Sequence, residues 1–223
     1  MIPTMYTLLI GNKNYSSWSL RPWLALRAAG IPFAEKKLWL DTPEFAAQLQ
    51  GLTPALRVPV LLDEGFAVWD SLAICEYVAE RHPDAGLWPS DARARARARS
   101  LVAQMHSGFG QLRSTLPMNV EASLPHVDAS PAQADIDAVQ ALWRDTRVEF
   151  GGNGPFLFGR FCIADAFFAP VVSRFATYAI PAEGEARAYR DAVLALPAMQ
   201  DWCRDARAEA TFVAIDEPYR THR

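Results

Sequence analysis

The chain has 223 residues, of which 51% are hydrophobic and 21% charged, a balance that excludes global disorder and predicts one large or two small globular domains. Its 22 basic and 25 acidic side chains give a net charge of −3, which excludes a bulk basic surface for nucleic acid. The 3 cysteines and 4 histidines are too few and too scattered for a disulfide framework or a metal site. We therefore expect neither a bound metal nor a nucleic-acid partner.

No stretch reaches the roughly 18 apolar residues that a membrane span needs. The first residues lack the basic segment and the cleavage site of a secretory signal. We therefore expect a cytoplasmic protein in a reducing compartment, without a membrane partner.

Residues 1–82 alternate short apolar runs with helical patterns. Strands are predicted at Tyr6–Ile10, Phe33–Leu40, Val58–Leu62 and Phe66–Trp69, and helices at Ser16–Gly30, Glu44–Gln50 and Asp70–Glu80. The segment Asp63-Glu64-Gly65 has the chemistry of a tight hairpin turn, so the last two strands should be antiparallel. The order βαβαββα predicts a small mixed four-stranded sheet covered by helices.

Residues 83–90 are rich in turn-forming residues and predict a linker to residues 91–223. Beyond the linker, strand signals nearly vanish. Helices are predicted at Asp91–Leu112, Pro131–Glu149, Ile163–Thr177, Glu183–Leu194 and Pro197–Ala208. The second domain should therefore be all-helical.

The junction between the first predicted strand and helix carries Ser16 and Ser17 at the amino end of the helix. A hydroxyl there has two possible roles. It can cap the helix by accepting a backbone N–H, which contributes about 1 kcal/mol. It can instead donate to an anion such as a thiolate, which the positive end of the helix also stabilises.

Two further junctions carry candidate binding residues. Pro59 cannot donate to a strand ladder, and a cis Val58–Pro59 bond would turn the Val58 N–H and C=O outward toward a peptide-like ligand. Asp70 and Ser71 begin a helix, either as an ordinary cap and first-turn hydroxyl or as a site for an amino-acid head group. In the second case Asp70 takes the ammonium and Ser71 the α-carboxylate.

Taken in order, these motifs resemble a cytosolic glutathione transferase. The resemblance rests on the serine-rich turn, on Val58-Pro59, on Asp70–Ile74 (DSLAI) and on Gly159–Asp165 (GRFCIAD). It covers nearly the whole chain and implies a thioredoxin-like domain followed by an all-helical domain. The serine turn with its following arginine is most similar to the zeta class, which includes maleylacetoacetate isomerase and dehalogenating transferases.

The resemblance implies glutathione as co-substrate and assigns its contacts by position. Ser16 matches the serine that stabilises the thiolate, with Ser17 as its neighbour. Val58, presented by Pro59, would pair with the cysteinyl part, and Asp70 with Ser71 would hold the γ-glutamyl end. For the glycyl carboxylate the candidates are Lys36, Lys37, Gln50 and Arg57, of which Gln50 and Arg57 are favoured.

A pocket for a small electrophile is implied between the two domains. Its candidate lining residues are Trp18, Trp39, His106, Phe109 and Arg174, with core packing as the alternative for the aromatic ones. The first helix of the second domain faces a dimer partner in this family, so a homodimer is expected.

The expected reaction is attack of the glutathione thiolate on an electrophilic carbon, in a conjugation or an isomerisation. The alternative is a non-catalytic binding or regulatory module on the same fold. A disulfide oxidoreductase is excluded, because Ser16–Ser19 stands where such enzymes place Cys-x-x-Cys.

The chain departs from the zeta pattern at two places. Trp18 stands where zeta enzymes carry a cysteine, so the floor of the site should differ. Cys162 lacks the hydroxyl of the usual Ser/Thr-x-x-Asp capping box, so we expect a weaker cap around Asp165 and an intact helix.

Overall fold

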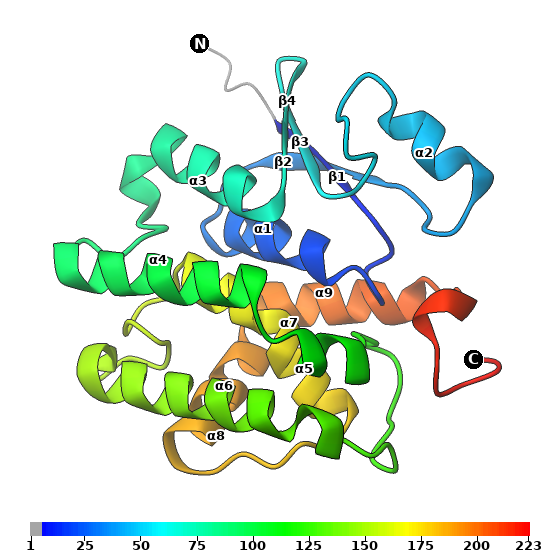
Figure 1. Cartoon of the computed structure of the whole chain (residues 1–223). Helices are drawn as coiled ribbons and strands as arrows, with labels where there is room; N and C mark the ends of the chain where they lie inside the picture. The colour runs from blue at the N-terminus through cyan, green and yellow to red at the C-terminus, as the bar shows by residue number, and fades with distance from the viewer. Residues whose placement is uncertain (1–5) are drawn as a thin grey trace.

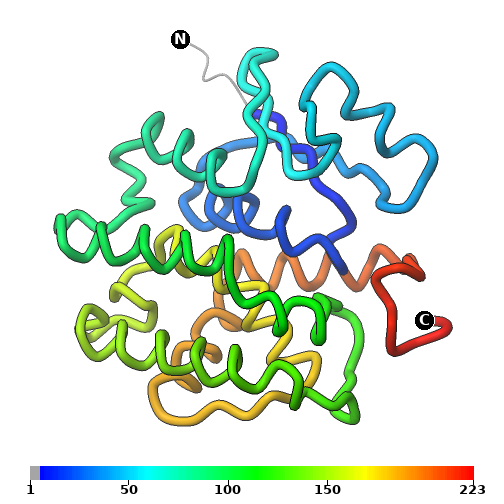
Figure 2. Tube along the Cα trace, viewed as in Figure 1, coloured from blue at the N-terminus to red at the C-terminus, as the bar shows by residue number. Residues whose placement is uncertain are grey.

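The computed structural model describes residues 6–223, so residues 1–5 of the predicted first domain lie outside the described residues. Figure 1 shows a sheet with its helices stacked on a larger group of helices. The trace in Figure 2 shows the C-terminal end of the chain returning to the side of the first half.

The predicted mixed sheet is confirmed. Its strands are β1 (Tyr6–Ile10), β2 (Phe33–Lys37), β3 (Val60–Asp63) and β4 (Phe66–Trp69), in the spatial order β2-β1-β3-β4. Strand β2 runs parallel to β1, and the other two pairings are antiparallel. Glu64 and Gly65 both adopt positive φ in the turn of the predicted β3–β4 hairpin.

Two strand boundaries differ from the prediction. Strand β3 begins at Val60 instead of Val58, because Pro59 has no N–H to give to the ladder and follows a cis peptide bond. Strand β2 ends at Lys37 instead of Leu40. Beyond it, the Leu40 N–H donates to the side chain of Asn12 at 2.9 Å instead of to a neighbouring strand.

Three helices accompany the sheet. They are α1 (Ser17–Ala28), α2 (Pro43–Leu49) and α3 (Ser71–Arg81), close to the predicted ranges. Helix α1 packs against α3 on one side and against α7 and α9 of the second half on the other. The first helix is therefore enclosed between the two halves of the molecule (Figure 1).

The second half of the described chain is helical, as predicted. Its helices are α4 (Ala92–Ser107), α5 (Gly110–Thr115), α6 (Gln133–Thr146), α7 (Ile163–Thr177), α8 (Gly184–Ala195) and α9 (Pro197–Ala208). Between α3 and α4 lies a short 3-10 turn at Pro83–Ala85. We retain residues 83–90 as the proposed boundary between two domains.

The predicted single helix over Asp91–Leu112 is wrong, because α4 and α5 are separated at Gly108 and Phe109. Gly108 is extended, and a Cβ there would lie 2.7 Å from the carbonyl oxygen of Gln104. Phe109 takes the left-handed conformation, with φ of 53°. The break redirects the chain so that Arg113 of α5 lies at the junction of the two halves.

The predicted helix over Pro131–Glu149 is also shorter than expected. A 3-10 turn at Ser130–Ala132 precedes α6, and a wider turn at Arg147–Gly151 follows it. Pro131 lacks the N–H of a helix interior, so the regular helix starts only after it.

One hydrophobic core runs through both halves. The same cluster contains four fully buried residues: Leu8 of β1, Leu24 of α1, Phe167 of α7 and Trp202 of α9. Because α1 contributes to this core on both sides, the position of its amino end is fixed by the packing of the whole chain.

Asp165 joins the start of α7 to the preceding loop. Its carboxylate is fully buried and accepts the N–H of Cys162 at 2.8 Å and that of Leu157 at 3.1 Å. Burial raises the pKa of Asp165 to about 6. Helix α7 forms intact although its N-cap residue, Cys162, has no hydroxyl, as predicted.

Replacing this carboxylate should destabilise the fold. Asp165→Ala leaves two buried backbone N–H groups without an acceptor, so the free energy of unfolding should fall by about 3 kcal/mol. Urea unfolding monitored by circular dichroism measures the change. Asp128→Ala, in an exposed turn, is the matched control and should cost under about 1 kcal/mol. Equal effects of the two changes would contradict the capping role.

Candidate active site

Two adjoining cavities lie where the sheet half meets the helical half. We call the first the serine cavity, of about 420 Å³, and the second the Asp70 cavity, of about 410 Å³. The serine cavity includes Ser16, Ser17, Trp18, Arg113, Met118 and Arg174 in its lining. The Asp70 cavity includes Trp18, Pro59, Asp70, Ser71, His106 and Arg113. Both are also lined by Arg57 and Val58.

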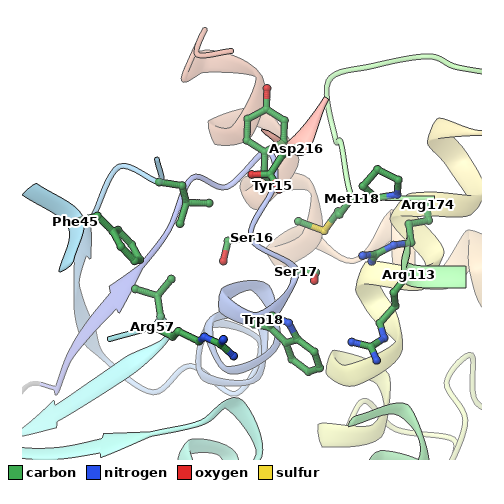
Figure 3. A pocket seen from close by; sticks show the side chains of 13 residues that line it. Tyr15, Ser16, Ser17, Trp18, Phe45, Arg57, Arg113, Met118, Arg174 and Asp216 are labelled. Atoms are coloured by element: carbon green, nitrogen blue, oxygen red, sulfur yellow. The ribbon is translucent and has the colours of Figure 1, made fainter. Parts of the chain in front are cut away.

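Ser16 and Ser17 stand at the amino end of α1, and each is 8% exposed. The Ser16 hydroxyl does not cap the helix. It donates instead to Ser19 Oγ at 2.8 Å. In Figure 3 the Ser16 hydroxyl lies on the side of Arg57, whereas that of Ser17 lies on the side of Arg113 and Arg174. The two hydroxyls thus serve different parts of one cavity.

The turn before these serines is held in place by hydrogen bonds. Ser19 Oγ accepts the Gly11 N–H at 3.1 Å, and the Ser16 N–H donates to the Asn12 carbonyl at 2.8 Å. A Cβ on Gly11 would lie 3.2 Å from the Cβ of Ser16, so glycine permits the close approach. The side chain of Asn14 reaches across to the Glu121 N–H at 2.8 Å.

The C-terminal segment (residues 209–223) anchors the same turn. Glu209 accepts the backbone N–H groups of Lys13 and Asn14 at 2.8 and 3.2 Å. The Tyr15 hydroxyl donates to Glu217 at 2.7 Å. Burial and the Glu217 carboxylate raise the pKa of Tyr15 to about 12. Although Tyr15 lines the serine cavity, its hydroxyl is committed to the C-terminal segment.

The Asp70 cavity combines a carboxylate with a buried hydroxyl. Asp70 has φ of 75° and caps α3 by accepting the N–H groups of Leu72 and Ala73. Its other oxygen lies 3.2 Å from His106 Nε2 of α4. Ser71 is 2% exposed, and its hydroxyl has no hydrogen-bond partner among the described residues. A ligand that carries an ammonium and a carboxylate on the same carbon suits this pair, because the ammonium can bind Asp70 and the carboxylate can bind the Ser71 hydroxyl.

Val58 lies between the two cavities and outside the ladder that joins β3 to its neighbours. Its bond to Pro59 is cis, the geometry that would turn the Val58 N–H and C=O outward. Arg57 precedes it and also lines both cavities. This segment thus places the guanidinium of Arg57 beside the backbone N–H and C=O of Val58.

The serine cavity has a basic wall. Arg174 is 4% exposed and donates to the carbonyls of Leu116 and Pro170 at 2.6 and 3.0 Å. Burial lowers the pKa of Arg174 to about 10, so its guanidinium is still charged at neutral pH. The one acidic lining residue is Asp216, whose pKa is raised by burial and by Asp41 and Glu217.

Three predicted site residues lie outside these cavities. Gln50 ends α2, Trp39 is 43% exposed beside Lys37, and Phe109 is buried at the start of α5. None of the three is among the residues that line either cavity. Their predicted roles at the glutathione or electrophile sites gain no support from the geometry.

Three polar or charged lining residues were missed by the sequence analysis: Tyr15, Arg113 and Asp216. Tyr15 adjoins the serine motif and could have been considered with it. Arg113 and Asp216 carry no local signal, because they reach the cavity only through the break after α4 and the return of the C-terminal segment.

Residues 6–223 contain no group of three or more side chains arranged to hold a metal ion. Over the same residues, no helix is both long and apolar enough to cross a membrane.

Residues 15–81 match the family described as the N-terminal domain of glutathione S-transferase. The chain is 36% identical over 102 residues to a probable maleylacetoacetate isomerase from Caenorhabditis elegans, covering 46% of this chain and 47% of that protein. It is 31% identical over 113 residues to the maleylacetoacetate isomerase of Rattus norvegicus, covering 50% and 51%. The aligned part thus spans about half the length of these relatives.

Solved structures extend the likeness to the whole fold. A glutathione transferase homologue from Burkholderia, with bound glutathione, superposes with a TM-score of 0.70 at 24% identity, covering 92% of this chain and 99% of that one. A tau-class glutathione S-transferase from Mangifera indica gives 0.69 at 21% identity, covering 92% and 97%. The fold is a thioredoxin-like domain followed by a helical domain. The first part of the chain, residues 15–81, therefore matches the N-terminal domain of glutathione S-transferases, and the fold of the whole described chain is similar to theirs.

The Tyr15 hydroxyl should contribute to stability through the C-terminal segment. Tyr15→Phe leaves the buried Glu217 carboxylate without one donor and should lower the free energy of unfolding by about 2 kcal/mol. Tyr219→Phe removes an exposed hydroxyl that donates to Thr115, and should cost under about 1 kcal/mol. Urea unfolding compares the two. A Tyr15→Phe protein as stable as the control would show that this contact does not anchor the turn.

Proposed function

We propose that the protein is a glutathione transferase that ionises the glutathione thiol for attack on a small electrophile. The observation that carries the proposal is the pair of serine hydroxyls at the positive end of α1, facing a basic cavity. Beside it, the Asp70 cavity offers the groups that an amino-acid head group needs. The Asp70 cavity thus suits the γ-glutamyl end of glutathione, the serine cavity suits its thiol, and Arg57, which lines both, suits its glycyl end.

Glutathione would lie along the sheet edge. Its α-ammonium would bind Asp70, and its α-carboxylate would bind the Ser71 hydroxyl at the positive end of α3. Its cysteinyl peptide would pair with Val58, which places the thiol in the serine cavity. Of the two favoured candidates for the glycyl carboxylate, Arg57 lines both cavities and Gln50 lines neither, so we favour Arg57.

The reaction begins when the bound thiol gives its proton to solvent. A hydroxyl from Ser16 or Ser17 and the end of α1 would stabilise the thiolate, whose free thiol has a pKa of about 8.5. The thiolate then forms a bond to an electrophilic carbon. In a conjugation a leaving group departs with its electron pair; in an isomerisation the sulfur itself is expelled after bond rotation.

The basic wall indicates an electrophile with a carboxylate. Arg113 and Arg174 both line the serine cavity, and neither forms an ion pair among the described residues. A ligand anion would supply the missing partner. The relatives named maleylacetoacetate isomerase act on a substrate of that type, which supports the same class here.

We further propose a cytoplasmic homodimer. The three cysteines, Cys75, Cys162 and Cys203, are free, which suits a reducing compartment. Phe66 on β4 is 65% exposed, an apolar side chain that a second copy could cover. Sedimentation showing only the mass of one subunit would contradict the dimer.

The two serines can be separated by substitution. Ser16→Ala should reduce turnover about ten- to a thousand-fold and leave the affinity for glutathione nearly unchanged, because the Ser16 hydroxyl would exchange its bond to Ser19 for one to the thiolate, and that donor is lost. Ser17→Ala should cause the smaller loss, because its hydroxyl lies on the electrophile side. Steady-state kinetics with each variant measures both. A larger loss with Ser17→Ala would transfer the thiolate role to Ser17.

The head-group assignment is tested by binding alone. Asp70→Ala should weaken glutathione binding at least about tenfold in calorimetric titration, because the α-ammonium loses its carboxylate. Asp63→Ala, on β3 and outside both cavities, is the matched control. An unchanged dissociation constant for Asp70→Ala would refute the assignment. No binding by the wild-type protein at several millimolar would favour a non-catalytic module.

A further inference from the structure

We propose that Trp18 determines which electrophiles this protein accepts, by holding the guanidinium of Arg113 at the junction of the two cavities. The inference rests on the proposed function, since it concerns the electrophile of that same site. It is carried by the surroundings of the Trp18 indole, which contacts two guanidinium groups and a histidine ring.

The first guanidinium belongs to Arg21, one turn along α1. Arg21 is 0% exposed, and only its Nη1 has an acceptor, the carbonyl of Ser17 at 2.8 Å. Its Nε and Nη2 are buried without a partner, and no carboxylate within 4.0 Å forms an ion pair with it among residues 6–223. A charge buried in this way needs another source of stabilisation.

The indole of Trp18 supplies that stabilisation. The guanidinium carbon of Arg21 lies 4.1 Å from the centre of the Trp18 ring and 5.4 Å from that of Phe167. Cation–π attraction is strongest for tryptophan and grows when the pair is desolvated. Arg21 and Trp18 therefore fix one another in the wall beneath the two serines.

The second guanidinium belongs to Arg113. Its carbon lies 5.4 Å from the centre of the same Trp18 ring, and its Nε donates to the Gly108 carbonyl at 3.2 Å. These two contacts orient the side chain but do not neutralise it. Figure 3 shows Arg113 beside Trp18 at the edge of the serine cavity, where an incoming anion can reach it.

A third contact fixes the indole from the Asp70 cavity. The ring of His106 lies edge-on to Trp18, with centroids 5.3 Å apart, and His106 in turn contacts Asp70. Trp18 lines both cavities, so it lies at their junction together with Arg57, Val58 and Arg113. A smaller side chain would join the two cavities and release Arg113 from its position.

The consequence is selectivity for small electrophiles that carry a carboxylate. With the indole in place, the positive charge of Arg113 lies at a fixed position next to the expected thiol. Without it, Arg113 is free to move, and the pocket is larger and less selective. Charge preference and size limit should therefore be lost together.

The experiment compares two electrophiles that differ only in charge, chloroacetate and chloroacetamide, each corrected for its uncatalysed reaction with glutathione. The wild-type protein should favour chloroacetate in kcat/KM. Trp18→Phe and Trp18→Leu should each lower that preference about tenfold, within the range of a lost cation–π contact. Trp88→Phe, in the linker segment, is the matched control and should keep the wild-type preference.

A binding measurement keeps the test independent of turnover. Calorimetry with S-carboxymethylglutathione and S-carbamidomethylglutathione gives the preference for the anion directly. Arg113→Met should lower that preference at least as far as the Trp18 variants do, and adding Trp18→Phe to Arg113→Met should change it no further. If Trp18→Leu fails to fold because Arg21 is left unpaired, the double variant Trp18→Leu/Arg21→Met removes that charge.

The outcomes separate the two proposals. Binding of both conjugates with a preference that survives in the Trp18 variants would overturn the role of Trp18 and leave the glutathione site intact. No binding of glutathione or of either conjugate by the wild-type protein would overturn the proposed function, and the inference with it. A preference lost in the Trp18 variants and kept in Trp88→Phe would support both.

Discussion

The site depends on the rigid turn at residues 11–16, which ends at the amino end of α1. This turn is held from several directions at once: by Leu40, by the segment around Glu121, by Glu209 and by Glu217. Most of these partners lie more than a hundred residues away in the sequence. The position of the two serines therefore follows from the packing of the whole chain. A substitution in the C-terminal segment can shift the two serines, because that segment holds the turn.

The electrostatics of the site follow from that packing. Helix α1 lies between the sheet and the helical half, so its positive end opens into the space between them. Arg113 and Arg174 approach the same space from the helical half, and Trp18 supports the buried Arg21 beneath it. A region with so little acidic compensation favours anions, first a thiolate and then a carboxylate beside it.

Part of the candidate site is encoded locally in the sequence. Ser16 and Ser17, the cis Val58–Pro59 bond and the pair at Asp70 are each encoded in a few neighbouring residues, and the structure places all of them around the two cavities. Residues that reach the site by tertiary packing were not predictable in this way. Arg113 depends on the break at Gly108, and the same break leaves Phe109 buried in the core and outside both cavities.

In this enzyme, we propose, the end of α1 and a serine hydroxyl ionise bound glutathione. The most direct test is the pH dependence of thiolate absorbance in the complex of the protein with glutathione, measured beside the Ser16→Ala variant. A thiol pKa about one or two units below the free value of about 8.5, rising in the variant, is the predicted result. A bound thiol that titrates as it does in water would contradict the account.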